Sequence, residues 1–213
     1  MTLIQGVRSA PYPQQAQGTP GRQIAVFSDR DGVFNEVDKH VNTPQQLLDA
    51  LIPESIEAAA RLTRELDCKL VIVTNQGGID AGFMSAEQNQ AIQETLVSEI
   101  EKAGGRADAV LFCPNGKKFK VPEGEADGRK PNAGMFYFAA NHFGPSIDFA
   151  DSYMIGDMST DIAAGEKADE RITTILVETG FAGKDGKVPF KADEVKADLS
   201  SAVDFILARE KSR

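Results

Sequence analysis

The sequence predicts an α/β fold built as a doubly wound parallel sheet with helices on both faces. The first observation behind this prediction is that short apolar runs alternate along the chain with longer segments of helical periodicity. The second is the length of 213 residues, which suits one domain around such a sheet. The third is that no apolar run reaches the ~18 residues of a membrane-spanning helix.

The chain is acidic, with 23 lysines and arginines against 32 aspartates and glutamates and a net charge of -9. General nucleic-acid-binding proteins usually carry a basic face, so this balance argues against that class. Its two cysteines cannot by themselves form a disulfide framework or a four-thiolate zinc site. The first residues lack the basic and apolar pattern of a secretion signal, so we expect a cytoplasmic protein that contacts no membrane.

The N-terminal segment differs in composition from the rest of the chain. Residues 1–22 are rich in proline, glycine and glutamine, which are poor core formers. We therefore expect an N-terminal arm or disordered tail over 1–22 and one folded domain over 23–213. The first strand is expected at 24–27, a short apolar run that stops at Asp29.

The next elements are two helices with a strand between them, and residues typical of helix starts predict where each helix begins. Pro53 predicts the start of a helix that continues to about residue 66. The apolar run 69–74 predicts a second buried strand. Ser85, with Gln88 three residues later, is a typical helix N-cap and predicts a helix as far as about Lys102.

The remaining sequence continues this alternation and completes the expected sheet. Strands are expected at 109–112, 153–155 and 172–177, and helices at 133–142, 159–168 and 199–209.

Chemically useful side chains follow the ends of the predicted strands. In parallel sheets the binding site lies at the carboxyl ends of the strands, so we expect these side chains to meet there. They are Asp29, Asp31, Thr74, Asn75, Asp157 and Asp161, with Arg129 and Lys130 directly before a helix.

This set of side chains favours phosphoryl transfer. Carboxylate oxygens are the ligands that Mg²⁺ prefers, and Asp157 would help to hold that ion. Of Asp29 and Asp31, one can act as a nucleophile and form an aspartyl phosphate, while the other protonates the leaving oxygen and activates water. Thr74 and Lys130 would hold the oxygens of the transferring phosphoryl group.

The chain resembles the haloacid dehalogenase (HAD) superfamily of phosphatases that use an aspartate nucleophile. Its four motifs occur in order, as Asp29-x-Asp31-Gly32, Thr74-Asn75, Lys130-Pro131 and Gly156-Asp157-x-x-x-Asp161. The segments DRDGVFN, VTNQGGI and RKPNAGMF are similar to the motifs of one subgroup. This subgroup contains histidinol-phosphate phosphatase, heptose-bisphosphate phosphatase and the 3′-phosphatase domain of polynucleotide kinases. The resemblance implies a Rossmann-like sheet.

The resemblance also implies a role for each matching residue. Asp29 would be the nucleophile and a Mg²⁺ ligand, and Asp31 the general acid and base with its backbone carbonyl on the metal. The other implied roles are metal binding for Asp157, support behind the metal ligands for Asp161, phosphate binding for Thr74, Asn75 and Lys130, and substrate or phosphate binding for Gln76 and Arg129.

The chain departs from these relatives after the third predicted strand. Many relatives carry a zinc loop of three cysteines and a histidine there, but only Cys113 is present in the segment 113–131, so we expect no structural zinc. Met158 stands where relatives often place a basic residue. The short connections leave no room for a cap domain, and we expect only a small flap at 34–43, in which Lys39 or His40 meets substrate.

These expectations lead to one main hypothesis and two alternatives. The main hypothesis is a Mg²⁺-dependent phosphatase of a small sugar or amino-alcohol phosphate, of the heptose-bisphosphate or histidinol-phosphate type. One alternative is a 3′-phosphatase for DNA or RNA ends, since an open site admits polymer ends and the segment 113–131 contains a basic cluster. The other is a non-catalytic phosphate-binding protein. The sequence leaves open the oligomeric state and whether segment 113–131 sets specificity. The cluster consists of Lys117, Lys118, Lys120 and Arg129.

Overall fold

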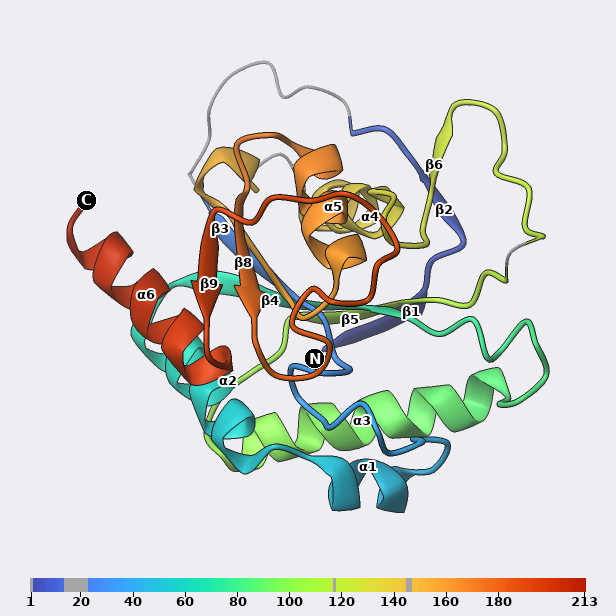
Figure 1. Cartoon of the computed structure of the whole chain (residues 1–213), viewed down its shortest axis with the longest axis horizontal. Coiled ribbons are helices and arrows are strands. Elements are labelled where there is room, and N and C mark those ends of the chain that lie inside the picture. Colours follow the sequence, from blue (N-terminus) through green and yellow to red (C-terminus); the bar gives the residue numbers. More distant parts are fainter. Residues whose placement is uncertain (1, 14–22, 117, 145–146) are drawn as a thin grey trace.

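The computed structural model describes residues 2–13, 23–116, 118–144 and 147–213, and the expected α/β fold is confirmed (Figure 1). A sheet with the strand order β1-β5-β4-β3-β7-β8-β9 forms its centre, and every neighbouring pair in this sheet is parallel. A second sheet pairs β2 with β6 in antiparallel orientation. The strands are β1 (Leu3–Gly6), β2 (Ser9–Pro11), β3 (Ile24–Ser28), β4 (Cys68–Asn75), β5 (Ala109–Cys113), β6 (Glu125–Asp127), β7 (Tyr153–Gly156), β8 (Thr173–Val177) and β9 (Glu194–Lys196).

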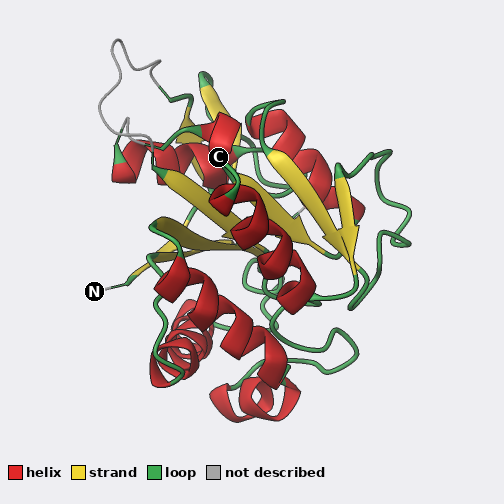
Figure 2. Ribbon diagram, turned by 90° about the vertical axis from the view of Figure 1, so that its left-hand side faces the viewer, coloured by secondary structure: helices red, strands yellow, loops and turns green. Residues whose placement is uncertain are grey.

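Helices cover both faces of the large sheet (Figure 2). One face carries α1, α2, α3 and α6, and the other carries α4 and α5 (Figure 1). The helices are α1 (Pro44–Ala50), α2 (Pro53–Glu65), α3 (Ala86–Lys102), α4 (Gly134–Phe143), α5 (Ser159–Ala168) and α6 (Leu199–Lys211), with a 3-10 turn η1 at Phe149–Asp151.

The strands supply alternate residues to two cores, one on each face of the sheet. In β4, Leu70 and Ile72 pack into the core beneath α2, α3 and α6, whereas Val71 and Val73 pack into the core beneath α4. All four side chains are at most 2% exposed. A strand that is buried on both faces has to be apolar throughout, which is why the runs of the central strands were visible in the sequence.

The elements of the predicted alternation are found close to their expected positions. Helix α5 has the expected bounds, and α3 begins with the expected capping box. There the amide of Gln88 donates to Oγ of Ser85 at 3.1 Å, and the amide of Ser85 donates to Oε1 of Gln88 at 2.8 Å. The sequence interpretation missed the short elements β1, β2, α1, β6 and β9.

Residues 3–11 of the expected N-terminal arm form strands that pack on the domain. Strand β1 is the edge strand of the large sheet beside β5, and β2 lies against β6 (Figure 1). Val7 and Ala10 are buried there, at 2% and 1% exposure. An edge strand needs few apolar side chains because it has a neighbour on one side only, so composition did not reveal it. Residues 14–22 of the expected arm lie outside the described part of the chain.

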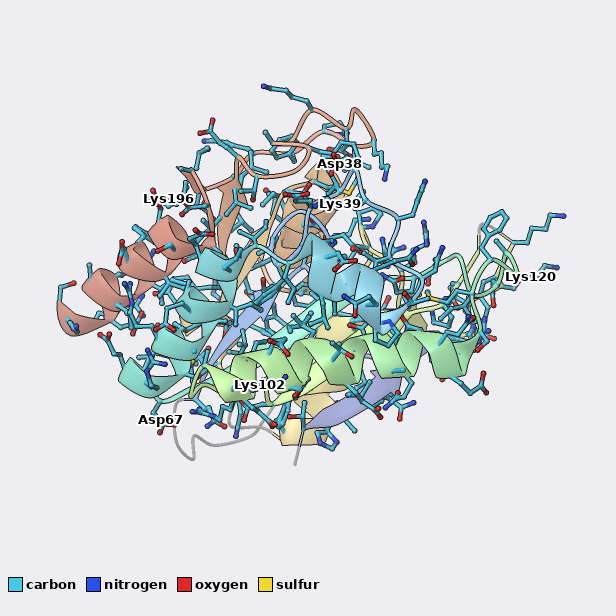
Figure 3. All side chains as sticks on the ribbon, turned by 90° about the horizontal axis from the view of Figure 1, so that it is seen from below. Asp38, Lys39, Asp67, Lys102, Lys120 and Lys196 are labelled. Atoms are coloured by element: carbon cyan, nitrogen blue, oxygen red, sulfur yellow. The ribbon has the colours of Figure 1, made fainter. Side chains whose placement is uncertain are left out.

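The connection between β3 and β4 forms a small flap and two helices, with no inserted cap domain. Asn35 lies in the flap and bridges through its backbone to Asp31 and Leu51. Lys39 pairs with Glu36 and donates to the carbonyl of Asp49 at 3.0 Å, so its ammonium group is held within the flap. Figure 3 shows Asp38 and Lys39 together on this segment. Within the described residues, no helix is long and apolar enough to cross a membrane.

Candidate active site

The carboxyl ends of β3, β4 and β7 bring most of the predicted site residues together. Asp29 follows β3, and its amide donates to the carbonyl of Ile155 in β7 at 2.9 Å. Thr74 lies near the end of β4, Asp157 follows β7, and Lys130 enters from the segment before α4. Parallel strands place all of these ends at one edge of the sheet, as the sequence predicted.

Lys130 lies at the centre of this edge. Its Nζ lies 2.7 Å from Oδ1 of Asp29 and 2.8 Å from Oδ1 of Asp161, and it donates to the carbonyl of Val73 at 2.7 Å. The residue is only 3% exposed. Burial alone would lower the pKa of Lys130, but the carboxylates of Asp161 and Asp29 outweigh burial and hold the pKa above its usual value. Lys130 is therefore a fixed positive charge between two buried acids.

Three buried carboxylates form a candidate metal site. Oxygens of Asp29, Asp157 and Asp161 lie within 4.8 Å of one another. Oδ1 of Asp157 is buried and has no hydrogen-bond partner among the described residues. Burial raises the pKa of Asp157 to about 7 and that of Asp29 well above its ordinary value. Three acids against one lysine leave an excess of negative charge and a bare oxygen, which fits a divalent cation such as Mg²⁺.

The loop after β8 closes this site from the far side, and the sequence analysis assigned no role to it. The amide of Phe181 donates to Oδ2 of Asp157 at 2.7 Å. Gly32 and Gly180 have positive φ angles of 84° and 67°, and a Cβ on either would lie 2.3 Å or 2.2 Å from the same oxygen. Asp157 thus fits between Gly32 and Gly180, neither of which has a side chain. The position of this loop after a predicted strand was the signal that could have identified it.

Asp31 is placed differently from Asp29. Its side chain is 36% exposed, and Nη2 of Arg30 lies 2.7 Å and 2.9 Å from its two oxygens. Asn35 and Gln76 also donate to it, at 3.1 Å and 3.2 Å. Burial alone would raise the pKa of Asp31, but the Arg30 charge and the donated hydrogen bonds outweigh it and lower the pKa. Arg30 and Asn35 lie within the recognised motif but were not singled out from the sequence.

Thr74 and Gln76 lie beside Asp31, whereas the side chain of Asn75 turns away. Oγ1 of Thr74 lies 3.4 Å from Oδ2 of Asp31 and accepts a hydrogen bond from Nε2 of Gln76 at 2.9 Å. The Asn75 amide donates to the carbonyl of Lys130 and accepts from its N–H, both at 3.0 Å. Both ends of the Asn75 side-chain amide are thus used to hold the Lys130 backbone in place.

Arg129 lies next to Lys130 in the segment before α4 and contacts the loops after β4 and β5. Its Nη1 donates to the carbonyl of Asn115 at 3.0 Å, and its N–H donates to Oδ1 of Asp127 at 2.9 Å. A Cβ placed on Gly77 would lie 2.8 Å from Nη1, so the guanidinium group rests against the loop after β4. Among the described residues, no carboxylate forms an ion pair with Arg129. The guanidinium group therefore lies beside Gly77 with its charge unpaired within the described part of the chain.

The other basic residues of segment 113–131 do not converge with Arg129 in the described structure. Lys118 and Lys120 are exposed, and Lys120 projects outward at the edge of the molecule (Figure 3). Lys117 lies outside the described residues. On the opposite side, Nζ of Lys187 lies 4.0 Å from Sδ of Met158, so a cation stands beside the position where relatives often have one.

Mg²⁺ binding is expected to release protons at pH 6 and few protons at pH 8. Because burial raises the pKa of Asp157 to about 7, most metal-free molecules carry a proton on this carboxyl at pH 6, and a bound cation displaces it. The folded pKa lies above the unfolded one, so this group reduces the stability of the metal-free fold as the pH rises toward 7.

Calorimetric titration of Mg²⁺ in two buffers of different ionisation enthalpy measures this proton release. Asp157→Asn should bind Mg²⁺ more weakly and reduce the dependence of proton release on pH. Equal proton release by the unsubstituted protein at pH 6 and pH 8 would contradict the raised pKa.

Comparison with known proteins gives a consistent set of relatives. The HAD-hydrolase-like family model matches residues 128–202. The D-glycero-beta-D-manno-heptose-1,7-bisphosphate 7-phosphatase of Haemophilus ducreyi is 36% identical over 191 residues, which cover 85% of this chain and 96% of that protein.

Solved structures extend the likeness to the fold. The D,D-heptose 1,7-bisphosphate phosphatase of B. bronchiseptica, crystallised with magnesium and phosphate, superposes with a TM-score of 0.75 at 29% identity and covers 88% of this chain and 99% of its own. A putative HAD-like phosphatase of Mesorhizobium loti has a TM-score of 0.69 at 26% identity and covers 97% of this chain and 94% of its own.

Proposed function

The chain belongs to the HAD-like phosphatases, in the family of the heptose-bisphosphate phosphatases, and from this premise we propose that it removes one phosphate from a sugar bisphosphate with Asp29 as nucleophile. The protein is a phosphatase, and Mg²⁺ is its cofactor. The observation that supports the proposed mechanism most is the meeting of Asp29, Lys130, Asp157 and Asp161 at one edge of the sheet.

The first chemical step transfers the phosphoryl group to the protein. A carboxylate oxygen of Asp29 attacks phosphorus in line, the bond between phosphorus and the ester oxygen breaks, and Asp31 gives its proton to the leaving alcohol. Asp31 is ionised in the free protein, but the negative charge of a bound phosphate raises its pKa and favours the protonated acid needed here.

The second step releases phosphate and restores the protein. Asp31, now ionised, accepts a proton from water while the water oxygen attacks phosphorus. The bond between phosphorus and the Asp29 oxygen breaks, and inorganic phosphate and free Asp29 carboxylate result. Arg30 and Asn35 hold Asp31 in place through both steps.

Several fixed groups favour these steps electrostatically. Lys130 holds Asp29 by an ion pair of 2.7 Å and offsets the repulsion between that carboxylate and an incoming phosphate. The hydroxyl of Thr74 lies next to Asp31, where it can donate to a phosphoryl oxygen. Asp29, Asp157 and the backbone carbonyl of Asp31 would hold Mg²⁺, and the ion would further neutralise the charge on the transferring group.

Arg129 supports the choice of a bisphosphate as substrate. The relatives are named for removing the 7-phosphate of a 1,7-bisphosphate, so their substrate keeps a second phosphate. The guanidinium group of Arg129 forms no ion pair with a carboxylate among the described residues, and it lies beside Gly77 and the carbonyl of Asn115. An unpaired guanidinium group binds phosphate well because its planar donors match two phosphate oxygens.

The test is phosphate release with saturating Mg²⁺ on a matched substrate panel. It compares heptose 1,7-bisphosphate, other sugar bisphosphates, the corresponding monophosphates, histidinol phosphate and a 3′-phosphorylated oligonucleotide. We expect kcat/KM for a sugar bisphosphate to exceed that of its monophosphate by at least about tenfold, the scale of one charge-assisted contact. A preference for histidinol phosphate or for the oligonucleotide would overturn the proposed substrate class.

Gly77→Ala is expected to raise KM for the bisphosphate by about tenfold, with a smaller effect on the monophosphate. The added methyl group would lie 2.8 Å from Nη1 of Arg129 and 3.2 Å from the carbonyl of Asn115, so the guanidinium group must move. Gly78→Ala is the matched control, because its added methyl group approaches only Cβ of Phe83, at 4.0 Å. Equal KM values for the two variants would show that Arg129 does not bind the second phosphate.

A further inference from the structure

Arg8 joins the loops after β4 and β5, although it lies far from the motifs in sequence. It stands in the turn between β1 and β2, and its guanidinium nitrogens lie 2.7 Å and 3.1 Å from the two oxygens of Asp80. Asp80 belongs to the loop after β4. Nη1 of Arg8 also donates to Oδ1 of Asn115 at 3.2 Å, in the loop after β5. The guanidinium carbon lies 5.7 Å from the centre of the Phe119 ring.

Asn115 connects Arg8 to Arg129. Its side chain is fully buried, and Nδ2 donates to the carbonyl of Arg8 at 2.5 Å and to Oδ1 of Asp127 at 2.9 Å. Its own carbonyl accepts the hydrogen bond from Nη1 of Arg129 at 3.0 Å. The same Asp127 oxygen accepts from the N–H of Arg129. Both the side chain and the backbone of Arg129 are therefore held by partners of the Arg8 segment.

The backbone supports the same connection. Strand β2 pairs with β6, which lies two residues before Arg129, and the N–H of Gly128 donates to the carbonyl of Arg8 at 2.9 Å. Figure 1 shows β2 and β6 side by side at the edge of the molecule. From the loop after β5, the amide of Gly116 donates to Oδ2 of Asp80 at 3.0 Å.

We propose that Arg8 is a positioning residue that holds the Arg129 guanidinium group in place for the second phosphate of the substrate. This inference rests on the proposed bisphosphate specificity, because it assigns a function to the segment that fixes Arg129. Arg8 clamps the loops after β4 and β5 together, and Arg129 lies between the two loops. Loosening the clamp lets Arg129 move, and a shift on the order of 1 Å weakens a directional contact strongly.

The Arg8–Asp80 ion pair is partly exposed, so its effect on the position of Arg129 can be tested apart from its effect on folding. The side chains of Arg8 and Asp80 are 48% and 27% exposed, and ion pairs at such positions contribute little to stability. Removing Arg8 should therefore change the binding geometry and leave the fold intact. The hydrogen bonds from Arg8 and from the Gly116 amide lower the pKa of Asp80 to about 2, so the pair stays charged throughout the neutral and mildly acidic range.

The experiment compares steady-state kinetics of four variants on a sugar bisphosphate and on its monophosphate. They are Arg8→Ala, Arg8→Lys, Arg129→Ala and the double alanine variant. Arg171→Ala is the matched control, because Arg171 forms an exposed pair with Asp169 just before β8, at the edge of the sheet opposite the site. Thermal unfolding of every variant verifies that it is folded.

We expect Arg8→Ala to raise KM for the bisphosphate by about three- to tenfold, with kcat and the monophosphate KM within about twofold of the unsubstituted protein. Arg8→Lys should raise this KM less than Arg8→Ala, since lysine keeps the positive charge but cannot form the bidentate contact with Asp80. In the Arg129→Ala background, Arg8→Ala should have no further effect, because the group that it positions is absent. Arg171→Ala should match the unsubstituted protein.

The outcomes separate this inference from the proposed function. If Arg129→Ala raises the bisphosphate KM and Arg8→Ala does not, the positioning role is wrong while the proposed substrate class stands. If Arg129→Ala affects both substrates equally, the proposed recognition of a second phosphate fails, and the inference fails with it. A fall in kcat on both substrates together with a lower unfolding temperature in Arg8→Ala would show that Arg8 merely stabilises the fold.

Discussion

Asp29→Asn is expected to lower phosphate release by at least about 10⁴-fold at saturating Mg²⁺ and substrate, the scale on which loss of a catalytic nucleophile acts. The amide is nearly isosteric with the carboxylate, so the loss follows from chemistry and not from a cavity. It cannot form the acyl phosphate because its oxygen is a poor nucleophile and its nitrogen lone pair is delocalised. The buried ion pair of 2.7 Å to Lys130 also becomes an ordinary hydrogen bond.

Because Asp29 is also a candidate metal ligand, loss of turnover alone does not identify the nucleophile. Asp31→Asn is the matched control, since it removes the acid and base but keeps the proposed nucleophile. An aryl phosphate labelled with ³²P has a leaving group that needs no proton, so Asp31→Asn should still form the aspartyl phosphate and then hydrolyse it slowly.

Rapid acid quenching of both variants distinguishes the two roles. Labelled protein, cleaved by hydroxylamine as an acyl phosphate is, should accumulate in Asp31→Asn and be absent from Asp29→Asn. Label on Asp29→Asn, or turnover by it after removal of contaminating phosphatases, would overturn the proposed mechanism.

The centre of the fold and most of the site could be predicted because their physical causes are local in sequence. A strand buried on both faces has to be apolar throughout, and parallel strands end at one edge, so the residues after each run mark the site. Asp29 and Asp157 were found in this way, Lys130 was found by its place directly before the helix predicted at 133–142, and the structure brings these charged groups together.

The remainder of the site depends on contacts between segments that are distant in sequence. Whether the Asn75 amide faces phosphate or the Lys130 backbone depends on how the segment before α4 approaches β4. The role of Phe181 depends on the loop after β8 folding back onto Asp157. Arg8 sits in a segment whose composition suggested a tail, and its partners Asp80 and Asn115 are 72 and 107 residues away. No local periodicity or spacing carries such information.

Lys130→Met is expected to destabilise the Mg²⁺-free protein by about 3–5 kcal/mol, the cost of removing one partner from a buried ion pair. Methionine fills a similar volume, so packing changes little. Loss of the Lys130 ammonium group leaves Asp29, Asp157 and Asp161 close together with no cation among them. In the unsubstituted protein burial already raises the pKa of Asp29 and that of Asp157, and the pKa of Asp29 rises further without the Lys130 charge.

The same substitution should make the protein respond more strongly to Mg²⁺. A site that has lost its internal cation attracts the metal more, so the rise in unfolding temperature on adding Mg²⁺ should be larger in Lys130→Met than in the unsubstituted protein. Turnover should nevertheless fall by about 10²–10³-fold even when the site is saturated with metal, because the ammonium group no longer offsets the charge on the transferring phosphoryl group.

Lys69→Met is the matched control for this prediction. Lys69 lies at the start of β4, at the edge of the sheet opposite the site, and forms a half-buried pair with Asp108 at 3.1 Å. Its replacement should cost less stability and leave both the Mg²⁺ response and turnover unchanged. If the two variants respond alike to Mg²⁺ in thermal unfolding, Lys130 does not balance the three carboxylates. If they differ as expected, the lysine and the metal neutralise the same buried carboxylates.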